Sequence, residues 1–419
     1  MGYASKSDVL IIGGGVIGLA CAYYLLKAGR GVTLIEQNTV ASGSSHGNCG
    51  TITPSHSPPL AQPGVILKAL KWMFTPDAPF RVAPRLDFEM LEWMVQFASR
   101  CNARDCRRVT AIKAPLLQRS RKLIGDLVRD EHLDCEFVES GTLYVHRELK
   151  AFEADSGLPK TLAEFGLEML PVSAARCREI EPALNGSIVG GYLNPGDARL
   201  RPDRYAAELA RVVAALGGTI VESTCVTGFR TDRGNVTGVL TDRGEFGADQ
   251  YVFAVGAWAP IVGAQLDLRI PIQPGKGYSI TYSLPGTVPR IPMTLKERSV
   301  CVTAWESGYR LGSTMEFAGY DSTLNRRRLD ALKRGAAEYL IDPEGPAVVE
   351  EWYGWRPMTF DDLPIIGYSG RWKNLMLATG HGMLGVTMSA VTGELVAQML
   401  TGAETALDTA PFNPLRFGI

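Results

Sequence analysis

The chain has 419 residues, enough for two or three domains, and its hydrophobic content of 46% is that of an ordinary globular protein. Its net charge of −1 gives no electrostatic reason to expect nucleic acid or another strongly charged partner. The eight cysteines show neither C-x-x-C spacing nor a paired histidine, so no zinc, iron–sulfur or other metal site is expected.

We expect no targeting signal in the N-terminal segment. It lacks an apolar signal stretch, and position 6 is lysine where a myristoylation pattern needs serine or threonine, so we expect a cytoplasmic protein. The 18 residues from Val9 to Leu26 are free of charge, which is long enough to be confused with a membrane span. Glycines in the middle of this stretch argue against a span, because they would destabilise a membrane helix and have no function in it.

Residues 8–38 instead carry the order of a dinucleotide-binding fold. A buried strand over 8–12 precedes a G-x-G-x-x-G pattern, made by Gly13, Gly15 and Gly18. The helix that follows directs its N-terminal N–H groups at phosphate oxygens. A second strand ends in Glu36, whose carboxylate can accept hydrogen bonds from both ribose hydroxyls. The pattern therefore predicts a site for the ADP part of a dinucleotide.

Helical and strand patterns follow the dinucleotide segment. Residues 41–64 are rich in serine, glycine and proline, and such a loop directly after a nucleotide fold usually wraps a ligand. Helices are expected from about 65 to 130 and over the amphipathic segment 201–218, which ends at glycine. One or two strands are expected within 135–148.

Further along the chain, the pattern changes from one sheet to another. A buried strand at 251–255 leaves through Gly256, which predicts another close approach to a ligand. Alternation and turn residues over 270–319 predict antiparallel strands of a second sheet, and a polar helix is expected over 322–339. Residues 375–400 predict a strand, a glycine turn and a long helix. This is a second approach site of the phosphate or flavin kind, which a simple nicotinamide domain does not need.

Five segments in this order resemble the flavin-dependent D-amino-acid oxidase and glycine oxidase superfamily, and most closely the bacterial D-amino-acid dehydrogenases. They are IIGGGVIGLACAYYL at 11–25, SHGNCGTITPSHSPPLAQPGVILKALKWM at 45–73, PIQPGKGYSIT at 271–281, GWRPMTFDDLPIIG at 354–367 and GHGMLGVTMSAVTGE at 380–394. The resemblance covers nearly the whole chain.

The resemblance implies an α/β fold with two domains. A Rossmann-like FAD-binding domain is expected from residues 1–84, 197–263 and 344–419. A substrate domain built on a large mixed or antiparallel sheet is expected from residues 85–196 and 264–343.

The resemblance also implies FAD as the cofactor and assigns its binding residues. The ADP part is expected at Gly13, Gly15, Val16, Ile17, Gly18, Glu36 and Gln37, with Val226 beside the adenine. The loop under the flavin is expected at Ser44, Ser45, Gly50, Thr51 and Ile52. Gly256 and Trp258 lie near the cofactor, and the pyrimidine end of its ring is expected at Gly382, Met383, Leu384, Gly385, Val386 and Thr387.

Arg356 in the GWRP segment matches the family's substrate-carboxylate arginine. A planar guanidinium binds a carboxylate through two hydrogen bonds and so fixes which face of the α carbon meets the flavin. The structural alternative is an ordinary ion pair with Asp361 or Asp362.

Three further residues are catalytic candidates with structural alternatives. The strand in which the family's oxidases carry an assisting tyrosine reads RSVCVTAW here, so Tyr278 is a substitute candidate or a plain sheet tyrosine. Arg310 either faces the flavin or is a solvent-side strand arginine, and His381 is expected to shape the flavin loop without proton chemistry. His46 and His56, in the wrapping loop, either line the pocket or are solvated.

The implied activity is oxidative deamination of a D-amino or D-imino acid. Hydride passes from the α carbon to flavin N5, the imino acid hydrolyses to a 2-oxo acid, and electrons go to a non-oxygen acceptor, a quinone or an electron-transfer partner. The alternatives are a glycine- or sarcosine-type oxidase that uses oxygen, a D-hydroxyproline dehydrogenase, and a non-catalytic flavin-binding subunit of an amine-oxidising complex.

The apolar segment 65–74 bears on the electron acceptor, since only Lys68 and Lys71 in it are polar. We favour a core helix of the substrate domain, because buried helices are apolar all round. The alternative is a peripheral contact with the inner face of the cell membrane, where the lysines approach anionic headgroups and electrons pass to quinone.

Overall fold

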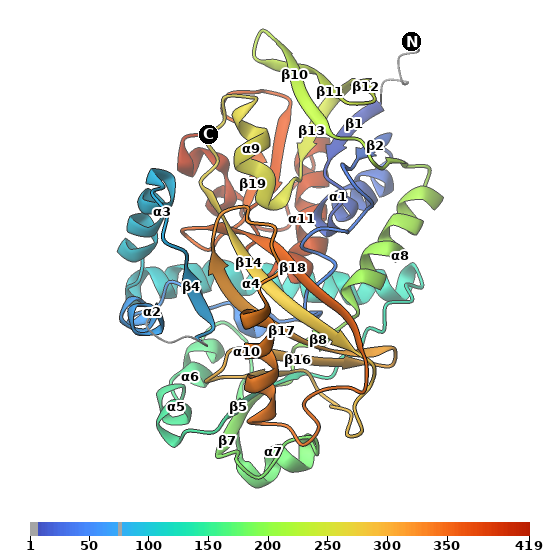
Figure 1. Ribbon diagram of the computed structural model, residues 1–419. Helices are drawn as coiled ribbons and strands as arrows, with labels where there is room; N and C mark the ends of the chain where they lie inside the picture. Colours follow the sequence, from blue (N-terminus) through green and yellow to red (C-terminus); the bar gives the residue numbers. More distant parts are fainter. Residues whose placement is uncertain (1–6, 74–77) are drawn as a thin grey trace.

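The computed structural model describes residues 7–73 and 78–419. Its first layer is a mainly parallel sheet with the strand order β19-β20-β13-β1-β2-β9 (Figure 1). The strands are β1 (Ser7–Ile12), β2 (Val32–Ile35), β9 (Thr219–Val221), β13 (Ala248–Phe253), β19 (Ile365–Tyr368) and β20 (Leu375–Thr379). Only the edge strand β19 pairs in the antiparallel sense in this sheet as described. The predicted strand–glycine–helix–strand order of the N-terminal segment is confirmed.

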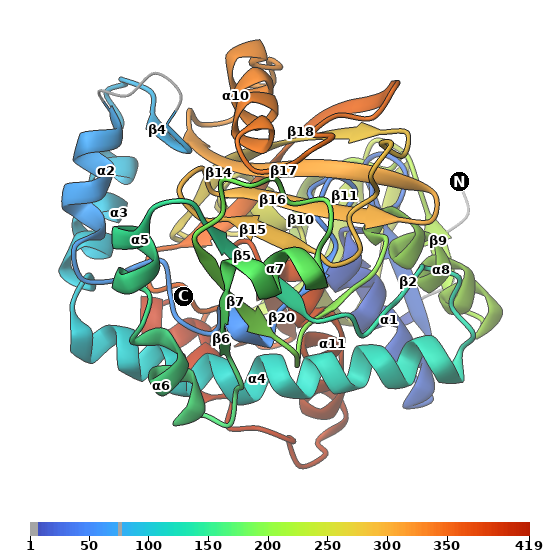
Figure 2. The same cartoon turned by 90° about the horizontal axis from the view of Figure 1, so that it is seen from below.

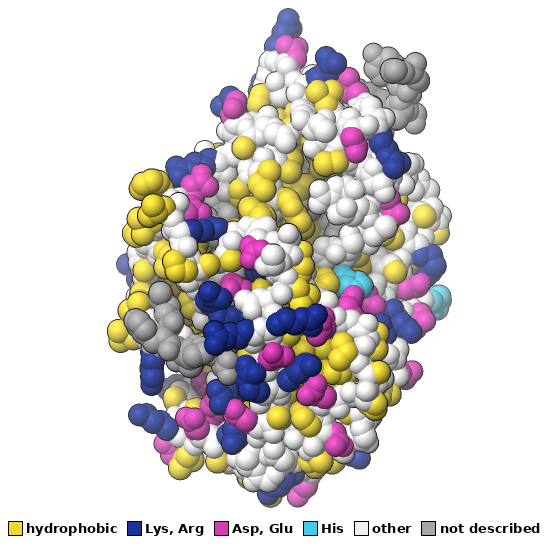
Figure 3. Space-filling view, in the orientation of Figure 1, with side chains coloured by type: hydrophobic (Ala, Val, Ile, Leu, Met, Phe, Trp, Pro, Cys, Tyr) yellow, Lys and Arg dark blue, Asp and Glu magenta, His cyan; other side chains and the backbone are white. Residues whose placement is uncertain are grey.

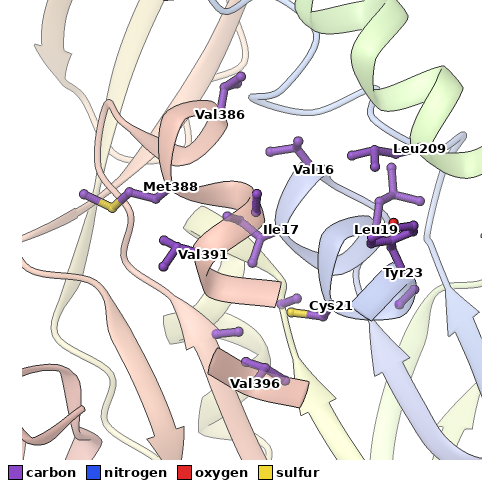
Figure 4. Packing of buried hydrophobic residues seen from close by; sticks show 14 of the residues in the cluster. Val16, Ile17, Leu19, Cys21, Tyr23, Leu209, Val386, Met388, Val391 and Val396 are labelled. Atoms are coloured by element: carbon purple, nitrogen blue, oxygen red, sulfur yellow. The ribbon is translucent and has the colours of Figure 1, made fainter. Parts of the chain in front are cut away.

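Helix α1 (Val16–Lys27) is packed between α8 (Pro202–Ala215) and α11 (Gly385–Thr401). Glycine allows the closest contact, since a Cβ at Gly393 of α11 would lie 2.5 Å from the carbonyl oxygen of Ala20. Figure 4 shows the aliphatic side chains of α1 and α11 that meet at this crossing, among them Ile17 and Val391. The charge-free stretch at 9–26 is therefore a buried strand and a buried helix of a globular domain.

The second layer is a large mixed sheet with the order β18-β14-β17-β16-β15-β5-β7-β6, to which β4 adds by pairing with β17. The strands are β4 (Phe80–Val82), β5 (Thr142–His146), β6 (Leu170–Ser173), β7 (Gly190–Asn194), β14 (Ile272–Tyr282), β15 (Met293–Leu295), β16 (Val300–Trp305), β17 (Gly308–Phe317) and β18 (Val348–Thr359). The predicted antiparallel pairing within 270–319 is confirmed for β14, β17, β16 and β15. The pairs β15–β5 and β17–β4 are parallel and make the sheet mixed.

Helices and small sheets surround these two layers. Helix α10 (Arg326–Ala337), somewhat shorter than the predicted 322–339, packs on the large sheet, and α4 (Ala103–Asp130) runs along the opposite side of the molecule (Figure 2). The remaining helices are α5 (Leu149–Ala154), α6 (Leu158–Ala163), α7 (Ala174–Ile180) and α9 (Ala259–Ala264), with 3₁₀ turns at Pro54–His56, Gly256–Trp258, Ala410–Phe412 and Pro414–Phe417. The small sheets are β3 (Thr51–Ile52) with β8 (Ala198–Arg199), and β10 (Val226–Asp232) with β11 (Asn235–Thr241) and β12 (Gly244–Phe246).

Helices α2 (Val65–Met73) and α3 (Phe88–Ser99) lie next to each other at one side of the molecule in Figures 1 and 2. The prediction that 65–74 forms a core helix is wrong for the described part, because Leu67 is 75% exposed; Phe74 lies outside the described residues. Exposed apolar side chains of these two helices, and of the residue Leu86 just before α3, form a surface that we term the α2–α3 face. Its residues are Ile66, Leu67, Leu70, Leu86, Phe88, Leu91, Met94 and Val95. The prediction failed because the hydrophobicity of a segment shows that its helix has an apolar surface. It does not show whether another element of the protein packs against that surface.

The chain order of the two sheets is interleaved. The strands of the parallel sheet come from 7–35, 219–253 and 365–379. The strands of the large sheet come from the segments between them, 80–194 and 272–359. β18 pairs along its length with β14 of the large sheet. The domain boundaries stay predictions. No helix within residues 7–73 and 78–419 has the length and hydrophobicity needed to cross a membrane.

Candidate active site

A cavity of about 590 Å³ lies between the two sheets. One wall is formed where strands β1, β2, β13 and β20 end, and the facing wall is formed by β14, β16, β17 and β18 of the large sheet. Figure 3 shows hydrophobic side chains along a hollow in the upper part of the visible face. In an open α/β sheet, ligands bind outside the carboxyl ends of the strands, so the cavity has the expected position for a ligand site.

The glycine turn after β1 brings bare backbone to the cavity. Gly13 has φ +107°, and a Cβ there would lie 2.5 Å from the carbonyl oxygen of Ala254. A Cβ at Gly18 would lie 1.9 Å from the carbonyl oxygen of Gly13, so only glycine lets α1 start so close to the strand. The N-terminus of α1 opens onto the cavity, where the Val16 N–H donates to Ser45 Oγ at 3.0 Å.

Glu36 follows β2 at the same edge of the sheet. Its Oε2 accepts the Gly14 N–H at 2.7 Å, and its Oε1 accepts the Asn38 N–H at 3.0 Å. Both bonds fix the carboxylate beside the glycine turn, where it lines the cavity. An oxygen atom has more than one lone pair, so the carboxylate can still accept from ribose hydroxyls.

A second helix terminus faces the same cavity. Gly382 has φ +55° and donates its N–H to the carbonyl oxygen of Pro357 at 3.0 Å, which turns the chain into the start of α11. Thr387 Oγ1 donates to the carbonyl oxygen of Thr51 at 3.2 Å and ties this helix to β3. Two positive helix ends converge on one cavity, an arrangement that favours a ligand with separated electron-rich groups.

The structure brings most of the predicted cofactor residues to this cavity. Those that line it are Gly13, Gly15, Val16, Ile17, Glu36, Gln37, Ser44, Ser45, Thr51, Val226, Gly256, Trp258, Gly382, Met383, Leu384, Gly385 and Val386. Gly18, Gly50, Ile52 and Thr387 support the wall from behind. At Gly50, for example, φ is +71° and a Cβ would lie 2.1 Å from the carbonyl oxygen of Leu200.

Arg356 lies in the wall that faces the glycine turn. Its Nη1 donates to the carbonyl oxygen of Thr314 at 2.7 Å, and desolvation by burial lowers the pKa of the guanidinium. The alternative ion pairs are not formed, because Asp361 pairs with Arg416 at 2.9 Å and Asp362 pairs with Lys113 at 2.6 Å. Within residues 7–73 and 78–419, no carboxylate pairs with Arg356. A desolvated guanidinium without a carboxylate partner favours an anionic ligand.

Tyr278 and Arg310, the other two candidates in the large sheet, have their polar atoms engaged elsewhere. Tyr278 lines the cavity, but its hydroxyl donates to Glu316 Oε2 at 2.6 Å, and burial together with this carboxylate raises its pKa. Arg310 is not part of the cavity wall. Its Nη1 donates to the carbonyl oxygens of His46 and Asn48, at 2.9 and 2.7 Å, so it holds the loop that contains these two residues onto β17.

The histidines differ in their surroundings. His381 is buried, lies 2.9 Å from Thr392 Oγ1, and has its pKa lowered by burial to about 3, so it is neutral at physiological pH. His56 lines the cavity, and burial lowers its pKa to about 4. His46 pairs with Glu350 at 2.7 Å, and this carboxylate raises its pKa. His56 and His381 are therefore neutral at physiological pH, and His46 is not among the residues that line the cavity.

Sequence reasoning missed several residues in the wall that lie on strands, namely Cys301, Gly277, Ser313, Trp352, Tyr353 and Trp355. Their common signal is the pairing of strands: Gly277 faces Gly354 and Tyr278 faces Tyr353 across β14 and β18. Because β14 and β18 are far apart in the sequence, only their register in the folded sheet shows that these residues share one wall. Trp258 and Trp355 meet edge to face, with ring centroids 5.6 Å apart, and close the wall near the 3₁₀ turn.

A sequence model of the family described as FAD dependent oxidoreductase matches residues 8–399. The chain belongs to this family. The converging helix ends, the glycine turn without Cβ atoms and the anchored Glu36 fit FAD, the family's cofactor. The predicted resemblance, the fold class and the cofactor are confirmed.

The chain is similar to three known proteins over 98% of its length. It is 34% identical over 415 residues to the D-amino acid dehydrogenase of Granulibacter bethesdensis, which covers 98% of this chain and 99% of that protein. It is 34% identical over 421 residues to the D-amino acid dehydrogenase of Allorhizobium ampelinum, with 98% of each chain covered. The crystal structure of glycine oxidase from Geobacillus kaustophilus superposes with a TM-score of 0.80 at 25% identity, again with 98% of each chain covered.

Proposed function

We propose that this FAD-dependent oxidoreductase deaminates a D-amino or D-imino acid and passes the electrons to an acceptor other than oxygen. The observation that carries the proposal is the Arg356 guanidinium, which faces the cavity without a carboxylate partner among the described residues. Two full-length relatives that share 34% of their residues with this chain are D-amino acid dehydrogenases, which supports the choice of substrate.

Arg356 is proposed to bind the substrate carboxylate. Two parallel charge-assisted hydrogen bonds contribute about 1.5–3 kcal/mol each at most, and they also fix the orientation of the α carbon. The Thr314 carbonyl oxygen holds Nη1 at 2.7 Å, so the guanidinium does not have to be ordered when substrate arrives. Anchoring before binding lowers the entropic cost of forming the complex.

The remaining wall is proposed to set the position of the substrate side chain and to exclude water. Trp352, Tyr353 and Trp355 supply apolar surface on the same strand as Arg356. FAD, when bound, supplies the electron-accepting ring that receives the hydride from the α carbon. The protein's part in this chemistry is to orient the substrate and exclude water, and neither task requires a side-chain nucleophile.

The balanced reaction is a two-electron oxidation followed by hydrolysis. The amino acid loses hydrogen from its α carbon and nitrogen to give an imino acid, and water converts this into a 2-oxo acid and ammonium. The two electrons leave to the acceptor. His381 is held neutral by burial, so it is proposed to shape the turn before α11 without carrying a proton.

The acceptor is proposed to be reached at a membrane surface. The α2–α3 face presents large apolar side chains, of which Phe88 is 87% exposed, and Lys68 and Lys71 are exposed on the same helix pair. Apolar side chains with lysines at their margin match the boundary between acyl chains and anionic headgroups. A quinone dissolved in that membrane is a suitable two-electron acceptor. The protein is proposed to be cytoplasmic, with peripheral contact at this face.

A substrate and acceptor screen tests the proposal. Purified FAD-loaded protein is assayed with D-amino acids, D-hydroxyproline, glycine and sarcosine, each with a redox dye, a quinone analogue and oxygen. The expected result is turnover of D-amino acids with dye or quinone at rates well above those with oxygen. Rapid oxygen consumption with glycine or sarcosine would make the protein an oxidase, and turnover of D-hydroxyproline alone would narrow it to a dehydrogenase of that cyclic amine. No turnover with any pair would indicate a non-catalytic subunit.

A further inference from the structure

Two thiols lie in the cavity wall beside Arg356, and the proposed reaction uses neither. Cys49 belongs to the loop that Arg310 holds, and Cys301 belongs to β16. Both line the cavity, and both are free thiols. Cys49 and Cys301 are far apart in the sequence, so only the fold brings them together.

The register of the large sheet puts the two sulfur atoms side by side. Cys301 is paired with Gly312 of β17, and a Cβ at Gly312 would lie 2.5 Å from Cys49 Sγ. Directly opposed residues of an antiparallel pair carry their Cβ atoms on the same face, about 4.5–5.5 Å apart. The Cys49 thiol thus fills the position of the side chain that Gly312 lacks, next to Cys301. The Cys301 thiol is within hydrogen-bonding reach of Cys49.

The surroundings give the two thiols different reactivity. The hydrogen bond from Cys301 and the positive charges of Arg310 and Arg356 lower the pKa of Cys49. The Cys49 sulfur and burial raise the pKa of Cys301 well above its usual value. Since the thiolate is the nucleophilic form, Cys49 is the sulfur that attacks an oxidant first, and Cys301 is the sulfur that follows.

We propose that Cys49 and Cys301 form a peroxide-reactive pair that closes to a disulfide inside the substrate cavity. The Cys49 thiolate attacks one oxygen of hydrogen peroxide, the O–O bond breaks, and the leaving hydroxide takes up a proton to become water. Cys49 is then a sulfenic acid. Cys301 sulfur attacks Cys49 sulfur, the S–O bond breaks, and the hydroxyl leaves as a second water with the proton from Cys301. The two thiols lose two electrons, and peroxide gains them.

Disulfide formation is expected to stop turnover reversibly. The bond ties the flavin loop to β16 and replaces two separate thiols by a bridge next to Arg356. The cavity changes shape at the place where the substrate carboxylate is proposed to bind, and reduction of the bridge by a dithiol restores it. Cys301 acts here as a resolving thiol, which protects Cys49 from irreversible oxidation.

The test treats FAD-loaded protein, in the absence of substrate, with hydrogen peroxide and follows both peptide masses and activity. The expected product is a Cys49–Cys301 cross-linked peptide, with at least about tenfold loss of activity that dithiothreitol reverses. In the Cys301→Ser variant the loss becomes irreversible and Cys49 is found as sulfinic acid, while Cys49→Ser keeps its own starting activity under peroxide. The control Cys101→Ser, outside the cavity wall, behaves like the unaltered protein.

Two outcomes overturn the proposal. One is the absence of the cross-linked peptide at peroxide concentrations that oxidise other cysteines of the chain. The other is a reversible activity loss that persists in both Cys49→Ser and Cys301→Ser. Because the peptide masses are read independently of turnover, they decide the proposal even where a substitution lowers basal activity.

Discussion

The Arg356 guanidinium lies across Gly277 of the neighbouring strand, where a Cβ would be 2.3 Å from Arg356 Nη1. Gly277 of β14 faces Gly354 of β18, so two glycines stand opposite each other beside the arginine. The missing side chain at Gly277 gives the charged group its place in the cavity wall. A residue without any functional group of its own thereby controls where the proposed carboxylate site lies.

Replacing Gly277 with alanine should therefore weaken substrate binding. The added methyl displaces the far end of a flexible side chain rather than backbone, so the fold should persist while the guanidinium moves. We expect KM to rise by about tenfold or more, which corresponds to about 1.4 kcal/mol, with FAD still bound. Steady-state kinetics and the absorbance of bound flavin provide the measurement. Gly186→Ala is the control, because a Cβ there meets no atom within 4 Å. An unchanged KM for Gly277→Ala would show that Arg356 is not the carboxylate site.

Removal of the charge itself should have a larger effect. In Arg356→Ala the substrate carboxylate loses charge-assisted hydrogen bonds of about 1.5–3 kcal/mol, so catalytic efficiency should fall at least about tenfold. Arg356→Lys should recover only part of the loss, because an ammonium group cannot form the bidentate pair. Arg371→Ala, which removes a surface arginine paired with Asp267 at 2.8 Å, serves as the control. Equal efficiency in Arg356→Ala and the control would assign Arg356 a structural role.

Asp197 gives the folded protein a predicted pH dependence. Its carboxylate accepts hydrogen bonds from Ser55 and Thr142, but burial raises its pKa to about 6. A raised pKa means that the folded state holds the proton more tightly than the unfolded state does. Its stabilising contribution is therefore complete below about pH 4 and is lost as the pH rises to about 6, by up to about 3 kcal/mol.

Urea unfolding at a series of pH values measures this contribution. The difference in unfolding free energy between the unaltered protein and Asp197→Asn should change over that interval and level off above it. A difference that is constant from pH 4 to pH 7 would mean that Asp197 is already ionised in the folded protein.

The α2–α3 face is predicted to bind membranes that contain anionic lipids. Leu67→Glu and Phe88→Glu place carboxylates where apolar side chains and anionic headgroups are proposed to meet, so each should reduce co-sedimentation with phosphatidylglycerol-containing vesicles. Val349→Glu is the matched control, since Val349 is 66% exposed on β18, outside the α2–α3 face. Dye-linked turnover without vesicles should be the same in all three variants. Vesicle binding that is equal for the unaltered protein and Leu67→Glu would place the acceptor contact elsewhere.

Local sequence patterns were sufficient for the cofactor side of the cavity. The turn at Gly13, the helix start at Val16 and the carboxylate at Glu36 lie within one short segment, so their spacing predicts their arrangement. The substrate side depends on residues that meet only after folding. Arg310, for instance, donates to the carbonyl oxygen of His46, 264 positions away, and no local pattern reveals that it holds a loop instead of facing the flavin.

Burial was the other quantity that the sequence did not supply. The apolar run of α2 is compatible with a core helix or with a surface for a partner, and the choice depends on whether another element packs on it. The hydroxyl of Tyr278 likewise depends on Glu316, a residue on the adjacent strand β17. In both cases the sequence shows the chemical character of the side chains. It does not show which residues contact them in the folded protein.

Anaerobic mixing of FAD-loaded protein with the two enantiomers of each amino acid tests the central claim most directly. The visible absorbance of the flavin reports reduction by the substrate and does not depend on which acceptor is supplied. We expect rapid bleaching with D-amino acids, slow or no bleaching with the L enantiomers, and formation of one 2-oxo acid for each reduced flavin. Bleaching by L enantiomers alone, or no bleaching by any amino acid while FAD stays bound, would contradict it.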